Sequence, residues 1–271
     1  MVFTCTAVAM DNAKTKLEGF VIKGGGRIGA LRSDVAIGPA HGSMHSQPAA
    51  RLPIKIFQIG FNKCGTSTIH HYLRSNGVRS IHWDHGRLAQ RMFANLANGD
   101  DLLAGYEAFD AFTDMEHLDA NGTFLEGFKL FPYLAAQYAN AVFILNTRDR
   151  EDWIRSRLRH SKGGYARRHH AYYKTRSDHE LAEVWRMEWE RHHTRVTHFF
   201  SKKPHRYFVC RIETDLPHLL NERLPECRLD DKHYKLYKVS RSRWQPSFLE
   251  RCASFAQRRI RSLLGIESRG G

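Results

Sequence analysis

The sequence predicts a three-layer α/β fold, in which helices cover both faces of a parallel sheet. Short apolar runs alternate with longer amphipathic segments between residues 54 and 160. The runs are apolar enough to be strands buried on both faces of a parallel sheet. With 271 residues, 42% of them hydrophobic, the chain has room for one large domain of this class and terminal extensions.

Strands and helices are expected to alternate along the chain. The apolar runs predict strands at residues 54–59, 78–82, 109–113, 141–147 and 207–212. The amphipathic segments predict helices at residues 66–76, 86–97, 123–138 and 150–160. Asp149 or Asp152 can cap the last of these, and a capping box from Ser177 to Glu180 begins a further long helix. Residues 161–177 are basic and aromatic, which fits either an acceptor-side lid or a solvated loop.

Three regions differ in composition. Residues 1–50 are rich in Gly, Ala, Ser and His without a sustained period, so a flexible N-terminal segment is expected. Residues 51–245 form the predicted α/β domain. Residues 246–271 form a basic C-terminal helix or tail, whose polar face suits either peripheral contact with an acidic membrane or plain solvation.

The first strand is followed by a phosphate loop. Gly60 and Gly65 have the spacing found in nucleotide-binding loops, and Thr66, Ser67 and Thr68 open the next helix. The first amides of that helix, its dipole and the three hydroxyls together favour a bound phosphate. A nucleoside triphosphatase would have its lysine directly after the second glycine, whereas here the lysine is Lys63, inside the loop. This displacement indicates a different ligand and a different chemistry.

A second anion-binding pair follows the fourth strand. Arg148 comes directly after the apolar run at 141–147, so it would lie at the carboxyl end of a strand, beside the phosphate loop. Ser156 follows two helical turns later. The two side chains can grip one phosphate together, or Arg148 can simply pair with Asp149 or Asp152 at the surface.

Together the two halves resemble the sulfotransferase superfamily, whose members use 3'-phosphoadenosine 5'-phosphosulfate (PAPS). Lys63, Cys64, Gly65, Thr66 and Ser67 match the family's first motif, and Arg148 with Ser156 matches the second. The resemblance extends from about residue 53 to about residue 240 and is closest to bacterial-type, single-domain members. It implies a PAPS site, without a metal, formed by Lys63, Cys64, Gly65, Thr66, Ser67, Thr68, Arg148 and Ser156.

The chain departs from the family pattern in two places. Cys64 stands where serine or threonine is commoner; its thiol can be activated at the helix terminus or can simply fill space. The arginine-lysine-glycine loop that binds the 3'-phosphate in the cytosolic animal branch has no clear counterpart. The basic residues Lys235, Lys238, Arg241 and Arg243 are candidates to take its place.

The resemblance implies in-line transfer of a sulfuryl group to an acceptor hydroxyl, with Lys63 neutralising charge on the leaving 5'-phosphate. The acceptor class expected by family analogy is a carbohydrate or a glycolipid. A base must accept the acceptor's proton. Asp114, after the third strand, is the first candidate and Glu116 the second. A further cluster of candidates is His82, Asp84 and His85.

Charge and cysteine content limit the expected partners and location. A net charge of +14 favours anionic partners such as PAPS and its product PAP. No recognisable nucleic-acid module is present, so no specific nucleic acid is expected. The five scattered cysteines show neither metal nor disulfide spacing, which fits a reducing cytoplasm. Two alternatives remain: a phosphate-loop kinase of small molecules, and a non-catalytic basic protein that binds polyanions.

Overall fold

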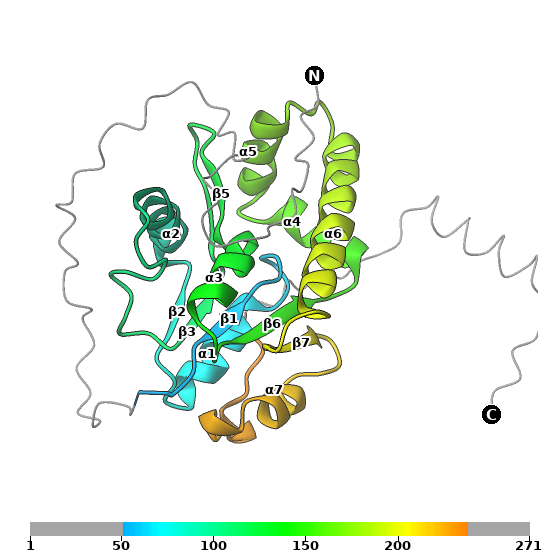
Figure 1. The fold of residues 1–271 in the computed structure, drawn as a ribbon. Coiled ribbons are helices and arrows are strands. Elements are labelled where there is room, and N and C mark those ends of the chain that lie inside the picture. The colour runs from blue at the N-terminus through cyan, green and yellow to red at the C-terminus, as the bar shows by residue number, and fades with distance from the viewer. Residues whose placement is uncertain (1–50, 238–271) are drawn as a thin grey trace, which may run out of the picture.

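A computed structural model of the protein describes residues 51–237 (Figure 1). The predictions for residues 1–50 and 246–271 lie outside the described residues, as do Lys238, Arg241 and Arg243. Within residues 51–237, no helix is long and apolar enough to span a membrane.

The centre of the fold is a parallel sheet with strand order β2-β3-β1-β6-β7. Its strands are β1 (Ile56–Gln58), β2 (Ser80–His82), β3 (Ala111–Thr113), β6 (Val142–Thr147) and β7 (Arg206–Arg211). Phe57 in β1 pairs with Phe112 in β3 and with Phe143 in β6, so the three central strands are in close register. The predicted parallel sheet is confirmed, and each of its five strands falls at a predicted apolar run.

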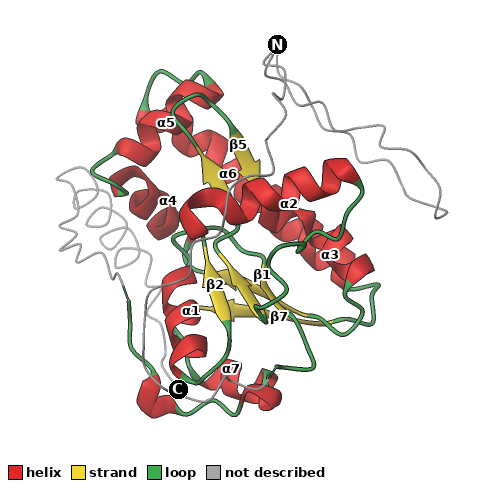
Figure 2. Cartoon of the chain, turned by 90° about the vertical axis from the view of Figure 1, so that its left-hand side faces the viewer, coloured by secondary structure: helices red, strands yellow, loops and turns green. Residues whose placement is uncertain are grey.

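Helices cover both faces of this sheet, which confirms the three-layer architecture. They are α1 (Thr66–Ser75), α2 (Arg87–Asn98), α3 (Phe131–Gln137), α4 (Arg150–Arg159), α5 (Gly164–Tyr173), α6 (Asp178–Phe200) and α7 (His218–Arg223). Phe57 packs in a core cluster with α2, α3, α4 and α6, whereas its neighbour Ile56 packs with α1 and α7. Figure 2 shows α1 and α3 on opposite sides of the strands.

The helix predicted at residues 123–138 is wrong in its first half. Phe124–Glu126 is a strand, β5, which pairs antiparallel with β4 (Glu116–Leu118) and forms a hairpin. A short 3-10 turn, Gly127–Leu130, then leads into α3. Gly127 marks the change, because a Cβ there would lie 3.0 Å from the carbonyl oxygen of Met115. Tertiary pairing therefore overrides the local helical pattern.

The segment 161–177, expected as a lid or loop, contains helix α5 instead. Its residues Tyr165, Ala166 and His169 are buried against the neighbouring helices α4 and α6. Burial of one face, which the local composition does not reveal, stabilises this helix. In Figures 1 and 2, α5 and β5 lie together beyond one end of the sheet.

The predicted helix caps are present. The Asp149 carboxylate accepts a hydrogen bond from the Asp152 amide at the start of α4. The Ser177 hydroxyl accepts from the Glu180 amide at the start of α6, and the Glu180 carboxylate accepts in return from the Arg176 amide. These caps fix where α4 and α6 begin.

Candidate active site

The phosphate loop connects β1 to α1, and its two glycines are needed for different reasons. A Cβ on Gly60 would overlap the backbone carbonyl of Asn146 in β6. Only glycine therefore lets the loop and β6 approach each other this closely. Gly65 has φ +74°, and a Cβ there would lie 2.8 Å from Ile212 Cγ2. Lys63 between them also has a positive φ, of +63°. The loop thus folds tightly over the end of β6.

Asn146 holds the loop in this shape through three hydrogen bonds. Its Oδ1 accepts from the Gly60 amide at 2.9 Å, and its Nδ2 donates to the carbonyls of Phe61 at 3.2 Å and Cys64 at 2.9 Å. The side chain is completely buried. Sequence reasoning missed Asn146, although a single amide inside the apolar run at 141–147 is a visible exception to its pattern.

A cavity of about 930 Å³ opens beside the phosphate loop at the carboxyl ends of the strands. Because β1 lies between β3 and β6, the loop after β1 has the end of β3 on one side and the end of β6 on the other. Predicted site residues that line the cavity are Lys63, Gly65, Thr66, Ser67, Thr68, Asp114, Glu116, Arg148 and Ser156. The sheet topology therefore brings together residues that are far apart in the sequence.

Cys64 differs from the other residues around it in the predicted loop motif, because it does not line this cavity. Its side chain is completely buried in the core beneath the loop. Burial raises the pKa of the thiol, and the nearby Arg148 lowers it by a smaller amount. The idea of a thiol activated at the helix terminus is therefore wrong, and the side chain fills space.

Arg148 is positioned by the phosphate loop itself. Its Nη1 donates to the Lys63 carbonyl at 3.2 Å, and its Nε lies 3.4 Å from Glu213 Oε1. Ser156, on the buried side of α4, lines the same cavity. The surface pairing of Arg148 with Asp149 or Asp152 is not observed; Glu213 is the partner instead.

The hydroxyls at the start of α1 have different surroundings. Thr68 Oγ1 accepts from the Tyr237 amide at 3.2 Å and donates to the Tyr237 carbonyl at 3.5 Å. These two bonds attach the backbone at Tyr237 to the start of α1. Ser67 Oγ lies 3.3 Å from His82 Nε2. The N-cap residue of α1 is Gly65, which has no side chain to bond the amides of the first turn. These amides, with Thr66 and Ser67, are therefore suited to an anion.

Asp114 follows β3 at the edge of the cavity, in the left-handed region with φ +53°. Its Oδ2 lies 3.6 Å from His82 Nε2, and its side chain is 19% exposed. His82 Nδ1 is also hydrogen-bonded to Thr113 Oγ1 at 3.0 Å. His85 lines the cavity as well, whereas the Asp84 carboxylate accepts from Arg87 and from the Tyr106 hydroxyl.

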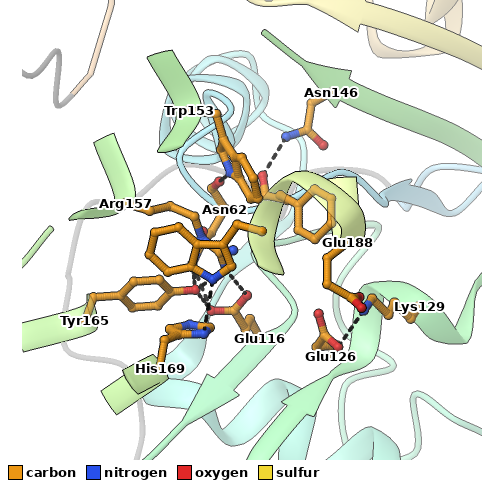
Figure 3. A network of polar contacts seen from close by, with 12 residues as sticks. Asn62, Glu116, Glu126, Lys129, Asn146, Trp153, Arg157, Tyr165, His169 and Glu188 are labelled. Atoms are coloured by element: carbon orange, nitrogen blue, oxygen red, sulfur yellow. Dashed lines mark hydrogen bonds and ion pairs between the residues drawn. The ribbon is translucent and has the colours of Figure 1, made fainter. Parts of the chain in front are cut away.

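Glu116 lies deeper, in a buried polar network (Figure 3). Its Oε1 accepts from Asn62 Nδ2 at 2.8 Å and from the Tyr165 hydroxyl at 2.6 Å. Arg157 Nη2 lies 3.3 Å from Glu116 Oε2, and Arg157 Nε donates to Asn62 Oδ1 at 3.1 Å. Burial raises the pKa of Glu116 to about 7, although the Arg157 charge acts in the opposite direction.

Arg157 is the centre of this network, and its side chain is only 2% exposed. Its guanidinium carbon lies 4.7 Å from the ring centroid of Trp153, 4.8 Å from that of Trp185 and 5.0 Å from that of Tyr165. The aromatic rings and Glu116 compensate for the burial of its charge. Sequence reasoning missed Arg157, because one more arginine in a basic helix carries no signal of its burial.

Comparison with known proteins agrees with this geometry. A family model described as a sulfotransferase domain matches residues 55–224, which is more than half of the chain. No curated protein matches the sequence. The matched range runs from the strand before the phosphate loop to the end of α7, and so contains the predicted residues from Lys63 to Ser156. The chain therefore belongs to the sulfotransferase family.

Proposed function

We propose that this protein transfers a sulfuryl group from PAPS to a hydroxyl of an acceptor. The supporting observation is that Lys63, Arg148 and Asp114, which follow three neighbouring strands, all line one cavity of about 930 Å³. That volume is within the range of pockets that hold a small organic ligand. A carbohydrate or glycolipid acceptor and a cytoplasmic location are further parts of the proposal.

The donor's 5' end is assigned to the phosphate loop. The uncapped amides at the start of α1, the hydroxyls of Thr66 and Ser67 and the ammonium group of Lys63 offer donors and positive charge. These groups match a sulfated 5'-phosphate, because every one of them can donate a hydrogen bond to an anionic oxygen. Thr68 is assigned a supporting role, since its hydroxyl is bonded to the Tyr237 backbone.

The 3'-phosphate is assigned to Arg148 and Ser156. Arg148 is held by the Lys63 carbonyl, so its guanidinium is positioned before the ligand arrives. This contact also ties the residue assigned to the 3'-phosphate to the loop assigned to the 5' end. We infer that the two phosphates of PAP are recognised by one connected unit.

Asp114 is assigned as the base in preference to Glu116. The oxygens of Glu116 face Asn62, Tyr165 and Arg157, so this carboxylate is already used in the buried network. Asp114 lies at the cavity edge with part of its carboxylate exposed. A base must reach the proton that it accepts, and Asp114 meets this requirement better.

In the proposed reaction the acceptor oxygen forms a bond to sulfur while the bond from sulfur to the 5'-phosphate oxygen breaks. Asp114 takes the proton of the acceptor hydroxyl, and PAP leaves with the bonding electron pair. Lys63 compensates the negative charge that grows on the leaving phosphate. Positioning and charge compensation supply the catalysis, as in phosphoryl transfer, and the proposal requires no metal.

The assignment of Arg148 is tested by comparing two ligands. In Arg148→Ala, the Kd of PAP should rise at least tenfold, whereas that of adenosine 5'-phosphosulfate should change little, because only PAP carries a 3'-phosphate. Arg191→Ala, an exposed arginine on α6, is the matched control for the loss of one charge. Equal weakening of both ligands would remove the assignment.

A further inference from the structure

The loop after β2 has an unusual backbone. Trp83, Asp84 and His85 have φ values of +59°, +47° and +55°, and Gly86 follows with φ +83°. Three successive residues with side chains are therefore in a region that L-amino acids avoid. Strain of this kind persists only where the surrounding structure imposes it, and it is concentrated at functional sites.

Contacts with the start of α2, with Tyr106 and with strands β3 and β4 hold this turn in place. The Asp84 carboxylate accepts from Arg87 Nη2 at 2.6 Å and from the Tyr106 hydroxyl at 2.6 Å. The Trp83 amide donates to the Thr113 carbonyl in β3 at 3.1 Å. A Cβ on Gly86 would overlap the ring of His117 in β4, so no other residue fits there without rearrangement. The turn is thus clamped between β3, β4 and the start of α2.

The clamped turn presents the indole of Trp83 at the cavity. Trp83 lines the cavity and is 45% exposed, whereas Trp153, Trp185 and Trp189 are buried. Trp83 and the proposed base, Asp114, both line this cavity, and the Trp83 amide is bonded to the carbonyl of Thr113, directly before Asp114. The His85 ring lies 5.5 Å from the indole, centroid to centroid, and also lines the cavity.

We propose that Trp83 is the platform on which the acceptor lies, and that the acceptor carries its hydroxyl on a ring with one flat, apolar face. This inference rests on the proposed function, because it uses Asp114 as the base. An exposed indole offers a wide π surface that packs against the C–H face of a sugar ring or against an aromatic ring. A ring held there has its hydroxyl at the rim where Asp114 lies.

The strained backbone, and the contacts that hold it in place, distinguish Trp83 from an ordinary exposed side chain. A glycine would adopt the backbone at position 83, with φ +59° and ψ −46°, more easily than tryptophan does. Placing a large aromatic residue there costs stability, and the contacts of Asp84 offset that cost. Trp83 is therefore a specificity-determining residue, and its removal should affect binding of the acceptor and spare the donor.

The test measures donor and acceptor binding separately in the full chain. The variants are Trp83→Ala, Trp83→Phe and, as a control that removes an exposed apolar side chain from α6, Met187→Ala. The ring probes are methyl β-D-glucopyranoside for sugars and 2-naphthol for aromatic rings, with glycerol as a probe without a ring. Their Kd values are measured by ligand-observed NMR with saturating PAP, and their KM and kcat values with PAPS.

We expect one ring probe to bind, and its identity tells a sugar acceptor from an aromatic one. Trp83→Ala should raise the Kd and KM of that probe about tenfold and change kcat less than about twofold. Trp83→Phe should stay within about threefold of the unchanged protein, because it keeps a ring. The Kd of PAP should be the same in all variants, which also shows that they fold.

Two results would overturn the platform while leaving the donor site intact. One is equal binding of the ring probe by Trp83→Ala; the other is the absence of binding by both ring probes in a protein that binds PAP. A protein that fails to bind PAP at all would instead remove the proposed function, and the platform with it.

Discussion

Asp114 and Glu116 are two residues apart, yet their surroundings suit them to different tasks. Asp114 stands at the cavity edge with a partly exposed carboxylate. Glu116 is buried, and burial raises its pKa to about 7. The neighbours of Glu116 are Asn62 in the phosphate loop, Arg157 in α4 and Tyr165 in α5. Glu116 therefore links three segments around the cavity, whereas Asp114 is the carboxylate that we propose as the base.

Asp114→Asn tests this division of roles. The substitution keeps the size of the side chain and removes its basicity, so kcat should fall by about 10²- to 10⁴-fold. The Kd of PAP should not change, because the donor is assigned to other residues. Steady-state kinetics with PAPS and calorimetry with PAP measure the two quantities. A variant with unchanged kcat would exclude Asp114 as the base.

At the scale of the element, the phosphate loop is shaped by the strand beside it. Gly60 makes room for the end of β6, and Asn146 bonds to both ends of the loop. Trp153 of α4 adds a further bond, from its indole Nε1 to the Asn62 carbonyl at 3.0 Å. The loop is therefore held before any ligand binds, which reduces the ordering cost of binding.

Asn146→Ala should destabilise the protein by about 3 kcal/mol, because three buried backbone groups lose their partner at roughly 1 kcal/mol each. PAP affinity should fall as well, since the loop loses its shape. Urea denaturation and calorimetry measure the two effects. Asn98→Ala, at the exposed end of α2, is the matched control. Equal stability of the two variants would show that Asn146 does not hold the loop.

The strands, most helices and the phosphate loop were predictable because their signals are local. Short, predominantly apolar runs predict buried parallel strands, and glycines with hydroxyl residues indicate an anion-binding turn. The hairpin of β4 and β5 was not predictable in this way. The residues of β5 lie inside a segment with a helical pattern, and the pairing of Glu116 with Glu126 is a tertiary contact. Helix α5 was also missed, because its burial against α4 and α6 is a tertiary contact that the local sequence does not reveal.

The residues of the candidate site that belong to a motif were predictable, whereas those whose role depends on burial were not. Lys63, Arg148 and Ser156 were found because their spacing matches a pattern, and the structure places them around one cavity. Asn146 and Arg157 were missed, because only the folded structure surrounds them with the loop or with aromatic rings. The role of a buried arginine or asparagine of this kind follows from the groups that contact it in the folded structure, and its neighbours in the sequence do not reveal it.

At the scale of the whole molecule, strand order decides which residues meet. The order β3-β1-β6 at the centre of the sheet puts the phosphate loop between Asp114 and Arg148. Parallel strands carry their carboxyl ends to the same edge, so three distant segments contribute to one cavity. The hairpin and α5, which lie beyond the sheet, extend this cavity through Glu116, Leu118 and Tyr165.

The buried network should also give folding stability a dependence on pH. The folded pKa of Glu116, about 7, is above its usual value of 4.5, so its contribution is complete below about pH 4.5 and is lost as the pH rises through about 7. In Glu116→Gln this loss is absent. The stability of the unchanged protein relative to Glu116→Gln should therefore fall by about 2 to 3 kcal/mol between pH 5 and pH 8. Urea denaturation of both proteins at the two pH values measures it; a constant difference would contradict the raised pKa.

The central claim is that the cavity binds a donor of the PAPS type through Lys63 and without a metal. Calorimetric titration with PAP in the absence of magnesium tests it most directly, with ATP and magnesium as the comparison. Lys63→Ala is the test variant, and Lys202→Ala, an exposed lysine after α6, is its control. We expect micromolar PAP binding that is retained in Lys202→Ala and lost in Lys63→Ala. Binding of ATP with magnesium in place of PAP, or PAP binding that is indifferent to Lys63, would contradict the account.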